Sequence, residues 1–151
     1  MRKPKKSIYI IASIIIALGA GIGTYLYQRY KYKKLIKLYK PLCDVTPEDM
    51  QKLPEEIVFN TIGKSMLPVI TEKSTIYATR IKNYEDLQVG DIVSFIIKFP
   101  ELNKYCEYIH RIIAKGYDSE GLYFITKGDN NWFNDGKIRP EQIFFIVTKI
   151  E

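Results

Sequence analysis

The apolar residues of this chain follow two patterns, one continuous and one interrupted. From Ser7 to Gln28 there is no charged residue, and this run of 22 residues would span about 33 Å as a helix, which matches a bilayer core. Lysines and arginines flank the run on both sides, and tyrosines lie near its ends, where amphipathic rings favour the headgroup region. We therefore predict a transmembrane helix within residues 1–29.

A cleaved signal peptide is the alternative for this run, since it would have the same charged start and apolar stretch. The run is long for a signal peptide, and bulky tyrosines follow its small residues, so an anchor is favoured. Gly19 and Gly23 form a GxxxG pair, which could serve a helix–helix partner or be ordinary glycine in a membrane helix.

Residues 30–56 have the character of a juxtamembrane segment. Up to residue 44, tyrosine, leucine and isoleucine are interleaved with lysine, which suits a segment at a membrane surface as well as a solvated linker. Thr46 followed by Pro47 predicts the start of a short helix, which Pro54 would end.

From residue 57 the pattern becomes interrupted. Short runs rich in Ile, Val, Tyr, Phe and Thr alternate with sequences typical of turns, such as VGD, FPELN and KGYDSEG. This spacing predicts a mainly β domain over residues 57–151. The expected strands are 57–62, 75–81, 92–99, 105–114, 122–126 and 143–150.

The charge distribution separates the same two regions. The net charge of +6 divides into +10 for residues 1–40 and −4 for residues 41–151. A nucleic-acid-binding domain needs lysine and arginine on its folded surface, whereas here the basic residues belong to the apolar run's flanks. Nucleic acid is therefore not an expected partner, and the lipid bilayer is.

The chain has one histidine and two cysteines, too few for a structural zinc site, so no metal and no cofactor are expected. Cys43 and Cys106 are far apart in sequence. Outside the cell they could pair, but two separate thiols are the favoured interpretation.

Three short segments contain candidate chemistry. In Gly63-Lys64-Ser65-Met66-Leu67-Pro68, Ser65 follows a predicted strand and a glycine, which places its hydroxyl on an accessible turn as an acyl-transfer nucleophile requires. His110 lies in an apolar, alternating strand, and a neutral imidazole is suited to take a proton from serine. Asp129 and Asp135 lie in a turn-rich segment, and a carboxylate could orient that imidazole. Each segment alone has an ordinary structural interpretation.

In this order, behind one anchor, the segments resemble the signal peptidase I family. Gly63–Pro68 resembles its G-x-S-M-x-P nucleophile box, and Gly90-Asp91-Ile92-Val93 resembles a strand start of the family. Ile109–Ile113 resembles its base-bearing strand, and Gly128-Asp129-Asn130-Asn131 resembles its G-D-N box. The resemblance covers the anchor and most of residues 57–150.

The residue before Arg111 is histidine, as in the endoplasmic-reticulum and archaeal subtype, where most bacterial and organellar members have lysine. By this resemblance Ser65, His110 and Asp135 form the catalytic set, and Asp129 is a supporting carboxylate. Gly63 departs from the serine usual in the histidine subtype, so the oxyanion hole would rely on backbone N–H groups. The nucleophile box itself is closer to organellar members.

The resemblance implies a membrane-bound serine endopeptidase that removes signal peptides from exported precursors after small residues. It also implies a cytoplasmic N-terminus and an extracytoplasmic catalytic domain. The charge rule alone points the other way, with four Lys or Arg before the apolar run and six after it. The six could instead bind lipid headgroups on the outer side.

Other functions fit parts of the sequence. A dedicated processing protease with few substrates would have the same motifs. A non-catalytic anchored β domain that binds a partner would carry Ser65 and His110 incidentally. The self-cleaving repressors of the bacterial damage response share the expected protease fold but have a DNA-binding domain and a lysine base. Lys98 and Lys104 are the nearest alternative lysines in this chain, and neither occupies the base position.

Overall fold

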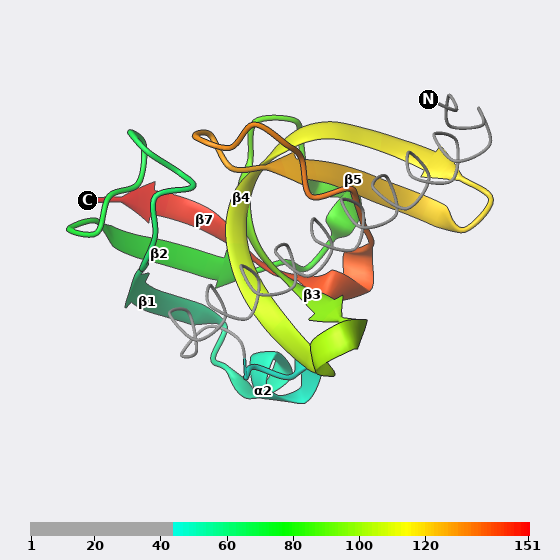
Figure 1. Cartoon of the computed structure of the whole chain (residues 1–151), viewed down its shortest axis with the longest axis horizontal. Coiled ribbons are helices and arrows are strands. Elements are labelled where there is room, and N and C mark those ends of the chain that lie inside the picture. The colour runs from blue at the N-terminus through cyan, green and yellow to red at the C-terminus, as the bar shows by residue number, and fades with distance from the viewer. Residues whose placement is uncertain (1–43) are drawn as a thin grey trace, which may run out of the picture. The chain divides into compact units, whose positions relative to one another are not determined.

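A seven-stranded antiparallel sheet forms the framework of residues 44–151, the part of the chain that the computed structural model describes (Figure 1). The strand order across the sheet is β1-β2-β7-β3-β4-β5-β6. The predicted mainly β fold class is thereby confirmed. The strands are β1 (Glu56–Asn60), β2 (Thr75–Arg80), β3 (Ile92–Phe99), β4 (Lys104–Asp118), β5 (Gly121–Lys127), β6 (Lys137–Ile138) and β7 (Ile143–Ile150).

Strand β4 is longer than its sequence predicts and shapes the whole sheet. Its first half pairs with β3 and its second half pairs with β5, and Arg111 faces both Ile92 of β3 and Lys127 of β5. Figure 1 shows β4 as a long curved ribbon that joins the two parts of the sheet. A register shift between Ile112 and Ala114 marks the bend, as expected of a β-bulge.

The predicted turn over residues 115–121 is wrong for most of its length, because β4 continues to Asp118. The close approach of β5 explains why a glycine, Gly116, lies within this strand. A Cβ at this position would lie 2.7 Å from the Tyr123 hydroxyl on β5, so only glycine leaves room for that ring. Strand β6 was not predicted, since two residues give no visible pattern.

The short helix predicted after Thr46 is present as α2 (Pro47–Lys52). Thr46 Oγ1 accepts a hydrogen bond from the Asp49 N–H, and the Asp49 carboxylate accepts one from the Thr46 N–H. This reciprocal capping box satisfies backbone donors that the first helical turn leaves unpaired. Met50 is buried and packs with residues of β2 and β7, which fixes the helix on the sheet.

Within residues 44–151 no helix is long and apolar enough to cross a membrane. The predicted span Ser7–Gln28, its Gly19 and Gly23 pair, and most of the predicted juxtamembrane segment lie outside the described residues.

Buried side chains form three clusters around the sheet. One combines residues of β3, β4, β5, β6 and β7, another joins α2 to β2 and β7, and the third lies beneath the segment that carries Ser65. The third cluster consists of Met66, Ile70, Ile76 and Ile92, so the candidate nucleophile segment is anchored in the core rather than laid on the surface.

Cys106 on β4 is buried and disulfide-bonded, so the favoured interpretation of separate thiols is wrong for this residue. Spacing along the chain could not reveal this, because a disulfide depends on how close two Cα atoms lie in the fold. Cys43 lies outside the described residues.

One carboxylic acid on β4, Glu107, is half-buried. The Ser94 hydroxyl donates a hydrogen bond to Glu107 Oε1 at 2.6 Å. Burial raises the pKa of Glu107 above its usual 4.5, because it disfavours the charged form, and the Ser94 hydrogen bond offsets part of this effect.

We predict that Glu107→Gln changes the pH dependence of folding stability. With a raised pKa in the folded state, the folded protein keeps its proton to a higher pH than the unfolded chain does. The free energy of unfolding of the wild type therefore falls as the pH rises from about 4.5 through the folded-state pKa. Glutamine cannot ionise, so the variant should gain stability relative to the wild type across this window.

Urea unfolding followed by circular dichroism at a series of pH values in detergent checks this prediction. Glu101→Gln, at an exposed position, is the matched control and should show no such gain. A stability difference between Glu107→Gln and the wild type that does not change with pH would contradict the prediction.

Candidate active site

Ser65 lies in a turn of the segment that connects β1 to β2, as the sequence predicted. The preceding Gly63 has φ +139°, a conformation that favours glycine. Ser65 is half-buried, and the next side chain, Met66, is buried in the core. The turn therefore leaves Ser65 partly exposed, while the buried Met66 side chain anchors the adjacent backbone.

The Gly128–Asn131 turn binds the backbone on both sides of the Ser65 peptide. The Asn130 N–H donates to the Ser65 carbonyl at 2.7 Å, and the Asn130 side-chain amide donates to the Lys64 carbonyl at 3.0 Å. A Cβ on Gly128 would lie 2.6 Å from the Ser65 carbonyl oxygen. Glycine at this position is thus required for the two turns to meet.

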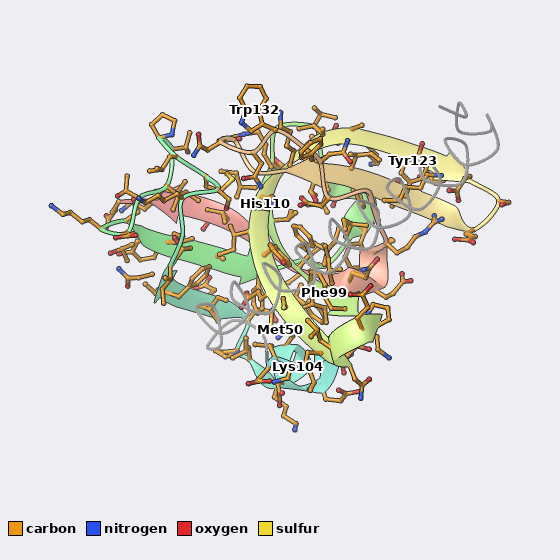
Figure 2. The ribbon with its side chains drawn as sticks, viewed as in Figure 1. Met50, Phe99, Lys104, His110, Tyr123 and Trp132 are labelled. Carbon is orange, nitrogen blue, oxygen red and sulfur yellow. The ribbon has the colours of Figure 1, made fainter. Side chains whose placement is uncertain are left out.

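His110 lies on β4 next to Arg111, where the strand passes from pairing with β3 to pairing with β5. Only 2% of its surface is exposed. The rings of Phe95 and Tyr108 lie 5.9 and 5.6 Å from the imidazole, centroid to centroid, and restrict its orientation. Figure 2 shows His110 beside the curved β4 ribbon, inside the domain.

Asp135 binds the imidazole directly. Its Oδ2 lies 2.8 Å from His110 Nδ1 and 2.8 Å from the donating Thr126 hydroxyl, and its N–H donates to the Thr126 carbonyl at 2.8 Å. An ionised carboxylate only accepts hydrogen bonds, so Nδ1 is the ring nitrogen that carries the proton. The predicted histidine–aspartate pair is therefore present, and its geometry leaves Nε2 as the basic nitrogen.

His110 Nε2 is the ring nitrogen that Asp135 leaves unengaged. No hydrogen bond among residues 44–151 involves this atom. Nε2 is thus the nitrogen at which the neutral ring can accept a proton.

Asp129 has a different partner from Asp135. Arg111 donates from Nε at 2.9 Å and from Nη2 at 2.7 Å to the two carboxylate oxygens of Asp129, and from Nη1 to the Gly90 carbonyl at 2.8 Å. The paired carboxylate raises the pKa of Arg111, and such two-point pairs fix geometry as well as charge. Asp129 thus holds the turn that binds the Ser65 backbone, which agrees with a supporting role.

Residues 128–136 connect the predicted parts of the site. One end of this segment binds the Ser65 backbone, and the other end carries Asp135 to His110. The Ser65 hydroxyl and His110 are not hydrogen-bonded to each other in the structure. In structures without substrate, hydrogen bonds between a nucleophile and its base are often long and tighten only when substrate binds.

The two alternative lysines have other neighbours. Lys98 lies over the ring of Tyr105, 5.7 Å from its centroid, and Lys104 pairs with Asp44. Within residues 44–151 no group of three or more His, Cys, Asp or Glu could hold a metal ion.

Thr126 is the site residue that sequence reasoning missed. It is fully buried and contributes its hydroxyl and its carbonyl to Asp135. A signal was present in the sequence: Thr126 is two residues from Phe124 on β5 and so lies on the same buried face, where a polar side chain needs a partner.

Comparisons with known proteins add no identification. The chain matches no family model, no curated protein and no solved structure. The candidate site therefore depends on the sequence motifs and on the contacts described above.

We predict that Asp135→Asn changes the tautomer of His110. The wild type should carry its proton on Nδ1 when the ring is neutral, whereas an asparagine amide can donate to Nδ1 and move the proton to Nε2. Because His110 is the only histidine, selective ¹⁵N-histidine labelling gives one spin system, in which NMR distinguishes the two tautomers.

Asp129→Asn is the matched control, because this carboxylate lies in the same segment but binds Arg111. It should leave the Nδ1–H tautomer in place. A neutral His110 ring in the wild type with its proton on Nε2 would contradict a hydrogen bond donated by Nδ1 to Asp135.

Proposed function

We propose that this chain is a membrane-bound serine endopeptidase of the signal peptidase I type that removes signal peptides from exported precursors. The hydrogen bond between His110 Nδ1 and Asp135 is the observation that supports this most strongly. It joins a histidine and an aspartate that lie 25 residues apart and that the family resemblance pairs in advance. A buried histidine without a catalytic role would also need a hydrogen-bond partner, but that partner would not have to be the aspartate that the resemblance pairs with it.

In the proposed reaction Ser65 is the nucleophile. His110 Nε2 takes the proton of the Ser65 hydroxyl as Oγ attacks the scissile carbonyl carbon. The resulting oxyanion is stabilised by backbone N–H groups, including that of Ser65. When the peptide C–N bond breaks, His110 returns the proton to the leaving amine. Water, activated in the same way, then hydrolyses the acyl-enzyme.

Asp135 and Asp129 have separate roles in this proposal. Asp135 keeps the imidazole in the Nδ1–H tautomer and stabilises the imidazolium that forms after proton transfer. Asp129 acts through Arg111 and keeps the Gly128–Asn131 turn against the Ser65 backbone. No cofactor enters the reaction.

The proposal includes membrane attachment through residues 1–29, with the catalytic domain outside the cytoplasm. The apolar run Ser7–Gln28 supports the attachment. A disulfide at Cys106 supports the location, because disulfides persist mainly in oxidising compartments. Both arguments agree with a site that meets precursors as they emerge from the membrane.

The main alternative is an anchored β domain that binds a partner without catalysis. It would need no histidine oriented through Nδ1 by an aspartate, so the site geometry favours the enzyme. A protease dedicated to one or few substrates has the same site and differs only in its range of precursors.

We predict that Ser65→Ala and His110→Ala each lower kcat for precursor cleavage by about 10⁴-fold or more, as loss of either member of a serine–histidine pair does. Cleavage of a precursor in detergent micelles, followed by gel shift and mass spectrometry of the new N-terminus, measures this. Ser119→Ala, at an exposed turn serine of the β4–β5 hairpin, is the matched control and should retain full activity. Substantial cleavage by Ser65→Ala would refute the assignment.

We predict that Asp135→Asn lowers kcat by about 10³- to 10⁴-fold with little change in KM, because the imidazole loses its orientation and its counter-charge. Asp129→Asn should have a smaller effect, since Arg111 and not His110 is its partner. Single-turnover kinetics of the two variants side by side make the comparison. An unchanged rate for Asp135→Asn would refute the orienting role proposed for Asp135.

A further inference from the structure

The disulfide of Cys106 needs a second cysteine. Cys106 lies on β4, is buried, and is disulfide-bonded. The chain has two cysteines, so Cys43 is the one partner that the same chain can supply. Cys43 is bonded to Asp44, the first described residue, so the contacts of Asp44 limit where Cys43 can lie.

The first two described residues lie beside the start of β4. The Asp44 carboxylate accepts a hydrogen bond from Lys104 Nζ, and Lys104 is the first residue of that strand. Val45 and Tyr105 pack against the same buried cluster. Figure 2 shows Lys104 at the end of β4 that lies toward α2, and His110 farther along the same ribbon. Consecutive residues of the two segments therefore meet.

The distances along both segments suit a bond between residues 43 and 106. Residues 104 and 106 lie on the same face of β4, since side chains of a strand repeat every second residue, at a spacing of about 6.7 Å. Consecutive Cα atoms lie about 3.8 Å apart, so Cys43 begins within one residue of the Asp44 contact. A disulfide needs Cα atoms about 4.4 to 6.8 Å apart. The contact of Asp44 with Lys104 brings Cys43 within reach of Cys106.

The ion pair alone holds this junction weakly. Its side chains are 39% exposed at Lys104 and 52% exposed at Asp44, and exposed ion pairs contribute little to stability. Among the described strands, the first half of β4 pairs only with β3, because the pairing with β5 begins at Arg111. A covalent bond would therefore add much to the attachment of this half of β4.

The same half of β4 carries the candidate base. Cys106, Tyr108 and His110 alternate along one face of the strand. The Tyr108 ring lies 5.6 Å from the imidazole, centroid to centroid. A bond at Cys106 thus anchors one end of the row of side chains that leads to His110.

We propose that Cys106 is paired with Cys43, and that this disulfide joins the residues after the predicted membrane helix to the strand that carries His110. The bond closes a covalent ring over residues 43–106, which includes Ser65 and the strands β1 to β3. Closing a long loop restricts the unfolded chain and so stabilises the folded one. The inference rests on the proposed location outside the cytoplasm, and not on the proposed catalysis.

Formation of the bond needs an oxidant, which a thiol–disulfide oxidoreductase of the oxidising compartment supplies as its own disulfide. The thiolate of one cysteine attacks this disulfide, and a mixed disulfide forms while one oxidoreductase sulfur leaves. The thiolate of the other cysteine attacks the chain's sulfur in the mixed disulfide, and the second oxidoreductase sulfur leaves. Two electrons pass to the oxidoreductase, whose two sulfurs take up the two thiol protons.

Mass spectrometry of the full chain identifies the pairing. The chain is incubated in detergent with oxidised glutathione, remaining thiols are blocked with N-ethylmaleimide, and trypsin is added. We expect residues 38–52 to be linked to residues 105–111 in a species that disappears on reduction. Glutathione on both cysteines, or a disulfide to a second copy of the chain on a non-reducing gel, would overturn the pairing.

The same analysis without glutathione, on chain purified from cell membranes, tests the location. The linked species should already be present. Free thiols in this sample, together with the linked species after glutathione treatment, would support the pairing and refute the location outside the cytoplasm.

Thermal unfolding in detergent, followed by circular dichroism, tests what the bond does. Cys43→Ser should lower Tm by about 10 °C or more relative to the oxidised wild type, because the unfolded chain loses a long covalent ring. Reduction of the folded wild type gives the same comparison without a substitution and should lower Tm equally. Reductant added to Cys43→Ser is the matched control and should change nothing. Equal Tm values for the oxidised and reduced wild type would overturn the stabilising role.

Neither measurement requires cleavage, so Ser65→Ala should form the same bond with the same effect on Tm. Cleavage that is absent while the bond is present would count only against the catalytic assignment. An active chain in which Cys43 and Cys106 do not pair would overturn this inference alone.

Discussion

The hydrogen bonds that meet at Asp135 Oδ2 determine what this site can do. His110 Nδ1 and the Thr126 hydroxyl both lie 2.8 Å from this one oxygen. The carboxylate therefore fixes both the orientation of the imidazole ring and its tautomer, because an ionised carboxylate can only accept hydrogen bonds. Without this contact the imidazole would be a buried polar group packed against Phe95 and Tyr108, and nothing would fix which ring nitrogen carries the proton. The assignment of Nε2 as the basic nitrogen depends on it.

The pairing of β4 explains how this contact arises. His110 and Arg111 are consecutive residues of a strand, so their side chains leave on opposite faces. His110 and Arg111 lie at the point where β4 changes its pairing partner from β3 to β5. Two aspartates of residues 128–136 bind these two side chains separately. Asp135 takes His110 and Asp129 takes Arg111.

The sequence predicts the mainly β fold and most strand positions, because alternation and turn chemistry are local signals, whereas the residues of the candidate site follow from the family resemblance. Local patterns alone do not separate the two aspartates, for which the family resemblance implied a catalytic role at Asp135 and a supporting role at Asp129. Their partners, His110 and Arg111, are adjacent residues whose side chains leave β4 on opposite faces. Thr126 was overlooked because a threonine in a β strand is ordinary until its burial is known. Residues 115–118 of β4 fall in a predicted turn because Gly116 and the charged residues around it are typical of one, whereas Tyr123 makes that glycine necessary.

One short segment serves three purposes, and this has a physical consequence. Residues 128–136 bind the Ser65 backbone through Asn130, orient His110 through Asp135, and carry Trp132 and Phe133 outward. Because Asp135 is only two residues from Phe133, a force on the aromatic rings acts on a backbone whose other end determines the imidazole position. The position of the two exposed rings and the position of the imidazole are therefore coupled through one short backbone segment. The hydrogen bonds to Thr126 and the Arg111 pair limit that coupling, since they fix the segment on both sides of the rings.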